Sequence, residues 1–196
     1  MTNTEKRYII NVCVSLQIRR CGNLNRVFES VKQARVKSRI DMTLHYIQHG
    51  DTSCLLHMIA VAYYSAKIAD MLRLDKRKRK SLIIGALLHD YFLYDWHKER
   101  KGKHIHGFTH PAEALKNASE DFELNAVEAD IIRKHMFPLT VIPPRYIESW
   151  IVCFVDKACS LYETFATGTY PEFRKFIREE YKEDIYKGDA ALQDKH

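Results

Sequence analysis

Two adjacent ionisable residues, His89 and Asp90, follow directly on an apolar run from Leu82 to Leu88. A buried carboxylate or imidazolium is costly without a partner, so this pair needs one. Asp156 has a similar setting in the segment SWIVCFVDKACSLYE, where apolar residues surround almost the whole predicted helix. A buried aspartate of this kind requires a cation, either Lys/Arg or a metal ion.

Three further histidines lie on predicted helix faces or at helix ends. His57 is in an apolar helical segment, His110 directly precedes Pro111, and His135 ends the segment ADIIRKH. A single histidine among apolar residues is more often a hydrogen-bonded core residue than a ligand. Four imidazoles and two carboxylates together, with no matching set of buried cations in the pattern, favour a divalent or trivalent metal centre. Nitrogen and oxygen ligands without thiolate suit Zn, Mn, Fe, Co or Ni.

The elements that must position these residues are predicted to be helices. The chain has only seven glycines and five prolines in 196 residues and little β-type alternation, which indicates a nearly all-α protein. Gly50-Asp51 is interpreted as the stop of one helix and the cap of the next, and Pro111 as a first helical residue. The long polar segment 92–110 is expected to be a functional loop. Helices are predicted at about 26–48, 53–73, 76–91, 111–119, 125–136 and 145–166, and after Pro171.

Composition and charge predict one helical domain at 26–170, a basic extension at 1–25, and a C-terminal helix and tail at 171–196. The net charge is +6, yet residues 1–40 alone hold nine Lys/Arg and two Asp/Glu, so the remainder is nearly neutral. No apolar run reaches the roughly 20 residues of a membrane span, and the N-terminus has no small-residue cleavage site. A cytoplasmic protein without a membrane partner is therefore expected. The five cysteines form no CxxC pair, which argues against a disulfide framework or a thiolate zinc site.

The six candidate ligands occur in the order H…HD…H…H…D, and this order resembles the HD-domain superfamily of metal-dependent phosphohydrolases. The resemblance covers about residues 40–165. The two intermediate histidines are similar to those of the subgroup that holds two metals, which includes bacterial diadenosine tetraphosphate hydrolases. The segments HDYFLYDWH, HGFTHP and IIRKHMFPLT also resemble a small branch of bacterial HD-domain hydrolases.

The resemblance implies an all-α, single-domain HD bundle. It also implies a metal-activated hydroxide that cleaves a phosphate ester or anhydride of a nucleotide or related small molecule. Asp90, with two carboxylate oxygens, would bridge two metal ions and take part in catalysis. The first ion would be held by His57, His89, Asp90 and Asp156, and the second by Asp90, His110 and His135.

Residues near the predicted loop supply candidates for contact with a phosphate. Asp95 and Lys98 are nearest in sequence to the metal-binding helix end and are predicted as catalytic residues, Lys98 also as a substrate contact. His106 and Lys157 are further candidates for substrate binding. Lys157 has three open interpretations: it pairs with Asp90, contacts phosphate, or emerges on the solvent side. Each loop residue also has an ordinary interpretation as a solvated side chain.

Other functions remain open at the level of sequence. A di-iron oxygenase could use the same six ligands, and a nucleotide-binding or sensing domain could keep its metals for structure alone. Residues 1–40 could bind nucleic acid, although no recognisable motif accompanies their charge and no such partner is expected. A separate metal site of His104, His106 and His110 is a weaker alternative. The substrate, the metal and the oligomeric state, a homodimer included, are not specified by the sequence.

Overall fold

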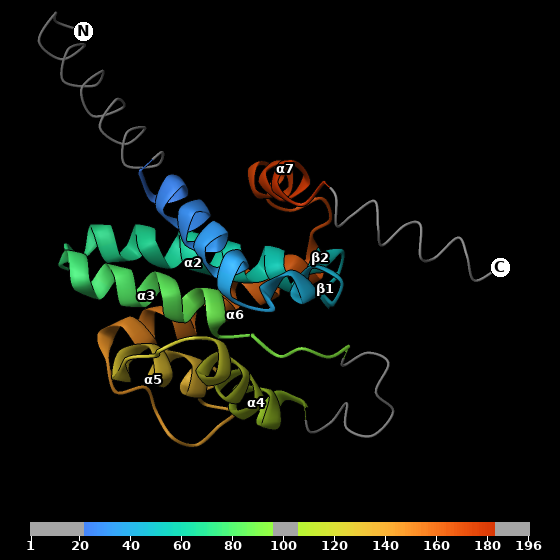
Figure 1. Cartoon of the computed structure of the whole chain (residues 1–196). Coiled ribbons are helices and arrows are strands. Elements are labelled where there is room, and N and C mark those ends of the chain that lie inside the picture. The colour runs from blue at the N-terminus through green and yellow to red at the C-terminus, as the bar shows by residue number, and fades with distance from the viewer. Residues whose placement is uncertain (1–21, 96–105, 183–196) are drawn as a thin grey trace, which may run out of the picture.

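The computed structural model describes residues 22–95 and 106–182, and the predicted all-α fold is confirmed. A helix at 22–37 comes first, and α7 is the last described helix, as Figure 1 shows. The elements that follow the first helix are η1 (Ile40–Leu44), β1 (Ile47–His49), β2 (Thr52–Ser53), α2 (Cys54–Met71), α3 (Lys76–Leu88), α4 (His106–Asp121), α5 (Ala126–Lys134), α6 (Ile147–Phe165) and α7 (Pro171–Glu180).

Local capping signals explain where several helices begin. The Ser53 side chain accepts a hydrogen bond from the backbone of Leu56 at the start of α2, and Asp75 caps α3 in the same way. Asn125 and Glu128 form a capping box at the start of α5. Pro171 occupies the first turn of α7, where it sacrifices no helical hydrogen bond. These helices agree with the predicted ones within a few residues.

The predicted helix at 26–48 is wrong in its second half. The helix ends at residue 37, and η1 and an antiparallel β1–β2 hairpin follow. Gly50 lies in the hairpin turn with a positive φ of 54°, and a Cβ there would stand 2.5 Å from the carbonyl oxygen of Glu163. Gly50 thus belongs to a tight turn pressed against α6, and it does not stop a helix. This hairpin brings Gln48 and His49 to the candidate site.

Pro111 also differs from its predicted place at a helix start. It lies inside α4, which already includes His106. Inside a helix, proline removes one backbone donor and its ring crowds the preceding turn, so the packing around α4 must outweigh this cost. The helix therefore extends to the N-terminal side of His110 and surrounds this histidine with regular structure.

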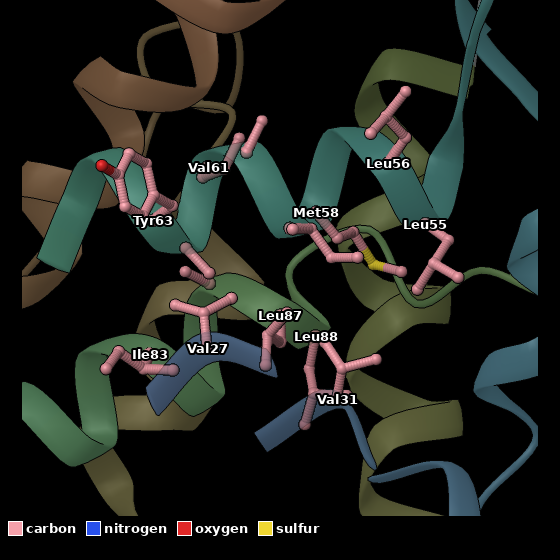
Figure 2. Packing of buried hydrophobic residues seen from close by; sticks show 14 of the residues in the cluster. Val27, Val31, Leu55, Leu56, Met58, Val61, Tyr63, Ile83, Leu87 and Leu88 are labelled. Atoms are coloured by element: carbon pink, nitrogen blue, oxygen red, sulfur yellow. The ribbon is translucent and has the colours of Figure 1, made fainter. Parts of the chain in front are cut away.

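Helix α2 lies at the centre and packs against both α3 and α6; α3 and α6 in turn pack against α5, and α4 also contacts α5 (Figure 1). Most of α2 is buried on all sides, as expected for a central helix. Figure 2 shows Val27 and Val31 of the helix at 22–37 on the side of α3 that carries Leu87, with Met58 of α2 on the other side, and all four belong to one buried cluster. Over the described residues, no helix combines the length and the apolar character needed to cross a bilayer.

Gly85 permits the close contact between α3 and α5. A Cβ on Gly85 would lie 2.6 Å from Cδ1 and 3.0 Å from Cβ of Ile131. Gly85→Ala is therefore expected to lower the free energy of unfolding by about 1–3 kcal/mol, the usual cost of overpacking, despite the better helix propensity of alanine. Urea denaturation measures this loss. Gly22→Ala is the control, because nothing lies within 4 Å of a Cβ there; equal stability of the two variants would contradict the prediction.

Candidate metal centre

Five helices bring the six predicted ligands to one place. His57 lies on α2, Asp156 on α6 and His110 on α4, while His89 and His135 are the C-caps of α3 and α5. Asp90 follows the end of α3. All six side chains are buried, and none of these residues exposes more than 5% of its surface. The separation in sequence is large, so only the packing of α2 to α6 assembles this cluster.

One half of the cluster surrounds Oδ2 of Asp90. Nε2 of His57 lies 3.7 Å and Nε2 of His89 lies 3.5 Å from this oxygen. The same two nitrogens lie 3.2 Å and 3.6 Å from Oδ1 of Asp156. His57, His89 and Asp90 each offer one ligand atom, and these three atoms lie within 4.8 Å of one another.

The other half of the cluster surrounds Oδ1 of Asp90. Nε2 of His110 lies 3.2 Å and Nε2 of His135 lies 3.4 Å from this oxygen, and the two nitrogens are 2.8 Å apart. These three residues form a second group whose ligand atoms also lie within 4.8 Å of one another. Asp90 therefore presents one carboxylate oxygen to each group.

Hydrogen bonds at the opposite ring nitrogen orient three of the imidazoles. Nδ1 of His89 donates to the carbonyl of Ala86 at 2.7 Å, and Nδ1 of His135 donates to that of Ile132 at 2.8 Å. Nδ1 of His57 donates to the Glu163 carboxylate at 2.8 Å. A histidine whose Nδ1 carries the proton keeps the Nε2 lone pair for a metal. All three rings direct Nε2 into the cluster.

The cluster is charged although it is buried. Burial opposes ionisation of Asp90 and Asp156, but contacts with the surrounding histidines hold the pKa of each carboxyl well below its usual value. Burial also disfavours a charged His57, yet its hydrogen bonds to Asp156 and Glu163 raise its pKa to about 10. Among the described residues, Asp90 and Asp156 form ion pairs with histidines and with no Lys or Arg. The positive charge that balances the two carboxylates therefore comes from imidazoles, and a metal ion bound to the same nitrogens would supply it in place of their protons.

Two atoms inside the cluster lack a hydrogen bond from any described residue: Nε2 of His89 and Oδ1 of Asp90. Such buried polar atoms are rare in native proteins and call for an explanation. A divalent cation fits both atoms, because it accepts lone pairs from nitrogen and oxygen and neutralises the carboxylates. The donor set of buried histidine and aspartate is therefore consistent with divalent metal binding.

The sequence did not predict a role at the site for three residues, Gln48, Glu163 and Tyr170. Nε2 of Gln48 donates to Oδ2 of Asp90 at 2.6 Å, and the Glu163 carboxylate is held by His57 and by the Tyr170 hydroxyl at 3.0 Å. Glu163 could have been found, because it lies seven residues after Asp156 and so on the same face of an apolar helix. Gln48 had no such signal, since its segment was predicted as a continuing helix.

A cavity of about 820 Å³ opens beside the cluster. Asp90, His110, His135 and Asp156 line it, together with Gly107 of α4 and with polar and apolar side chains from the hairpin, α6 and the segment after α5. These further side chains are Gln48, His49, Met136, Pro138, Leu139, Lys157, Ser160, Leu161 and Thr164.

Of the four other residues predicted to act in catalysis or substrate binding, the described part of the structure places only one, Lys157, at the cavity. Lys157 lines the cavity, and its ammonium donates to the carbonyl of His135 at 2.7 Å. Asp95 is half-buried and is not among the residues that line the cavity. His106 is the first residue of α4, but its side chain and the whole of Lys98 lie outside the described residues. The roles of these four residues stay predictions.

A profile of the HD domain matches residues 55–160, which is more than half of the chain and includes all six candidate ligands. The chain belongs to the HD domain family, whose members are generally metal-dependent hydrolases. No curated protein and no solved structure matches this chain. The match lies inside the predicted domain at 26–170, whose outer boundaries stay predictions.

Proposed function

We propose that this protein is a metal-dependent phosphohydrolase that cleaves a phosphate ester or anhydride of a nucleotide or a related small molecule. The observation that carries the proposal is the position of Asp90, whose two oxygens face two separate groups of histidines. Asp90 could thereby contribute one oxygen to each of two metal ions, and two ions held close together would suit the hydrolysis of a phosphate ester or anhydride. Membership of the HD domain family supports the same class of reaction.

In this proposal His57, His89, Asp90 and Asp156 hold one metal ion, and Asp90, His110 and His135 hold the second. Metal ions at these positions would acidify a water molecule and neutralise charge on the phosphoryl group. The protein contributes orientation: the Ala86 and Ile132 carbonyls and Glu163 fix the rings of His89, His135 and His57. Gln48 holds Asp90 from the hairpin side.

The cavity next to the cluster has the size and lining for a nucleotide-like substrate. Its volume of about 820 Å³ falls within the 300–1,000 Å³ that is typical of small-molecule sites. Lys157 places a positive charge at the wall, and Ser160 and Thr164 add hydroxyl groups. Met136, Leu139 and Leu161 supply an apolar side on which a base could pack. We further propose that Lys98 and His106 contact the phosphate and that Asp95 assists proton transfer.

Elemental analysis of the purified protein, followed by a screen of nucleotides and phosphate esters with the metal found, tests this function. Metal-dependent release of phosphate or of a nucleotide product, in anaerobic buffer with Mn or Co, is the expected result. Histidine and carboxylate ligands also suit iron, which makes a di-iron oxygenase the second candidate. Oxygen consumption by the Fe(II) form, without hydrolysis of any phosphate tested, would contradict the proposed hydrolase and support the oxygenase.

A further inference from the structure

The outer face of α6 is apolar, which is unusual for a helix at the surface of a protein. Phe154, Leu161 and Phe165 expose 64%, 63% and 82% of their surface, and Ile147 and Tyr162 are about half exposed. Surface helices normally place charged residues on the solvent side. The acidic residues of α6, by contrast, are all buried: Glu148, Asp156 and Glu163.

The single basic residue of α6 does not make this face polar. Lys157 is half-buried, and its ammonium bends back to the carbonyls of His135 and Cys153. The apolar surface also continues beyond the helix. Phe154 stacks on Trp150, which contacts Phe137 in turn. Val141 and Ile142, in the segment before α6, are exposed as well. The apolar residues of α6, joined through Trp150 to Phe137, form a patch of the kind that marks an interaction surface.

We propose that this face of α6 binds the same face of a second copy of the chain. A twofold contact requires a self-complementary surface, in which residue i of one copy meets residue j of the other and residue j meets residue i. The stripe on α6 consists of Ile147, Trp150, Phe154, Ala158, Leu161 and Phe165, which recur at helical spacing. An antiparallel crossing near residue 156 places Ile147 opposite Phe165, Trp150 opposite Leu161, and Phe154 opposite Ala158. Large side chains therefore meet smaller ones at every step.

The amount of apolar surface is sufficient for a stable pair. A fully covered aromatic side chain buries about 150–250 Å². The stripe and its flank include Phe154, Phe165 and Tyr162, each more than half exposed, and the aliphatic side chains add to them. Together they approach the roughly 800 Å² per partner of a standard interface. The acidic residues of α6 are buried in the chain itself, and the Lys157 ammonium already donates to the carbonyls of His135 and Cys153, so the contact would desolvate little charge of α6.

The stripe adjoins the candidate active site without depending on it. Leu161 belongs to the stripe and also lines the cavity, as does Leu139 from the segment after α5. A second copy on α6 would therefore lie at the cavity rim. The contact itself rests on exposed side chains that are not candidate metal ligands. A negative result in the dimerisation test therefore leaves the proposed hydrolysis unaffected, and a failure of the proposed hydrolysis leaves the dimer unaffected.

Sedimentation velocity of the full chain over a range of concentrations tests the pairing. We expect a concentration-dependent dimer, and we expect Phe154→Glu to raise its dissociation constant at least about tenfold, as loss of an interface hot spot does. Ala158→Arg, which fills the small position opposite Phe154, should have a similar effect. Met71→Glu is the matched control: Met71 is 78% exposed on α2, outside the stripe, and this variant should dimerise normally.

Circular dichroism of each variant verifies that the helical fold is kept, since all three positions are exposed. A wild-type chain that stays monomeric at every concentration overturns the proposal, and so does a Phe154→Glu variant that dimerises as tightly as Met71→Glu. A monomer that binds phosphatidylserine vesicles and loses this binding in Phe154→Glu also overturns it, in favour of a membrane surface as the occupant.

Discussion

Asp90→Ala is expected to eliminate both hydrolysis and most metal binding. Asp90 is the residue that faces both histidine groups, through Oδ2 on one side and Oδ1 on the other. Loss of a residue that only hydrogen-bonds a metal ligand already lowers metal affinity or activity by about 10–100-fold. Loss of a ligand shared by both groups should therefore lower kcat/KM by more than about 100-fold. Elemental analysis should show fewer than half of the wild-type metal ions per chain, because both groups lose an oxygen.

Two further variants separate metal loss from unfolding. Asp90→Asn keeps the size of the side chain and one oxygen but removes the negative charge, so it should bind metal more weakly than the wild type and fold normally. Asp130→Asn removes a carboxylate on α5 that pairs with Lys134, away from the cluster, and should retain metal and activity. Hydrolysis that is unaffected in Asp90→Ala would contradict the catalytic role of Asp90 and would place that activity outside the cluster, which would leave the cluster a structural, binding or sensing role.

Glu163→Ala is expected to weaken metal binding through His57. Glu163 is fully buried, and its carboxylate accepts hydrogen bonds from Nδ1 of His57 and from the Tyr170 hydroxyl. Without it, Nδ1 of His57 loses the acceptor that directs Nε2 toward the cluster. Outer partners of this type contribute about 10–100-fold to metal affinity, so the dissociation constant should rise by about that factor. Isothermal titration calorimetry of the metal-depleted protein with the metal measures this change in dissociation constant without any assay of activity.

The conservative variant distinguishes positioning from packing. The amide oxygen of Glu163→Gln can still accept the hydrogen bond from Nδ1 of His57, so this variant should recover a large part of the affinity. Glu148→Gln alters another buried carboxyl of α6, outside the cluster, and should bind metal like the wild type. If Glu163→Ala bound metal normally, or if Glu148→Gln lost affinity equally, Glu163 would be only a core residue.

Helix positions and the composition of the donor set were readable from the sequence because both are local properties. Caps such as Asp75 and Asn125 identify where α3 and α5 begin, since they bind backbone groups three residues away or fewer. An aspartate within an apolar helix signals a buried charge wherever its partner lies. Asp156 and the His89-Asp90 pair were therefore identified as needing a cation, and the histidines supplied a chemically consistent set of ligands.

The long-range partners were decided by tertiary structure. The predicted helix at 26–48 ends at residue 37 instead, and η1 and the start of the β1–β2 hairpin, whose turn packs against α6 at Gly50, take the place of its second half. Gln48 meets Asp90 across 42 residues of sequence, and His57 meets Glu163 across 106. A periodic pattern specifies which face of a helix is buried, but it does not specify what that face meets.

By itself, the sequence determined that four imidazoles and two carboxylates must be satisfied inside a helical protein, because burying ionisable groups has a cost that does not depend on the fold. Only the packed structure decided that Asp90 divides its oxygens between two groups and that Lys157 turns to the carbonyl of His135. Side-chain direction at a helix end depends on which neighbours fill the adjacent space, and those neighbours come from distant parts of the chain.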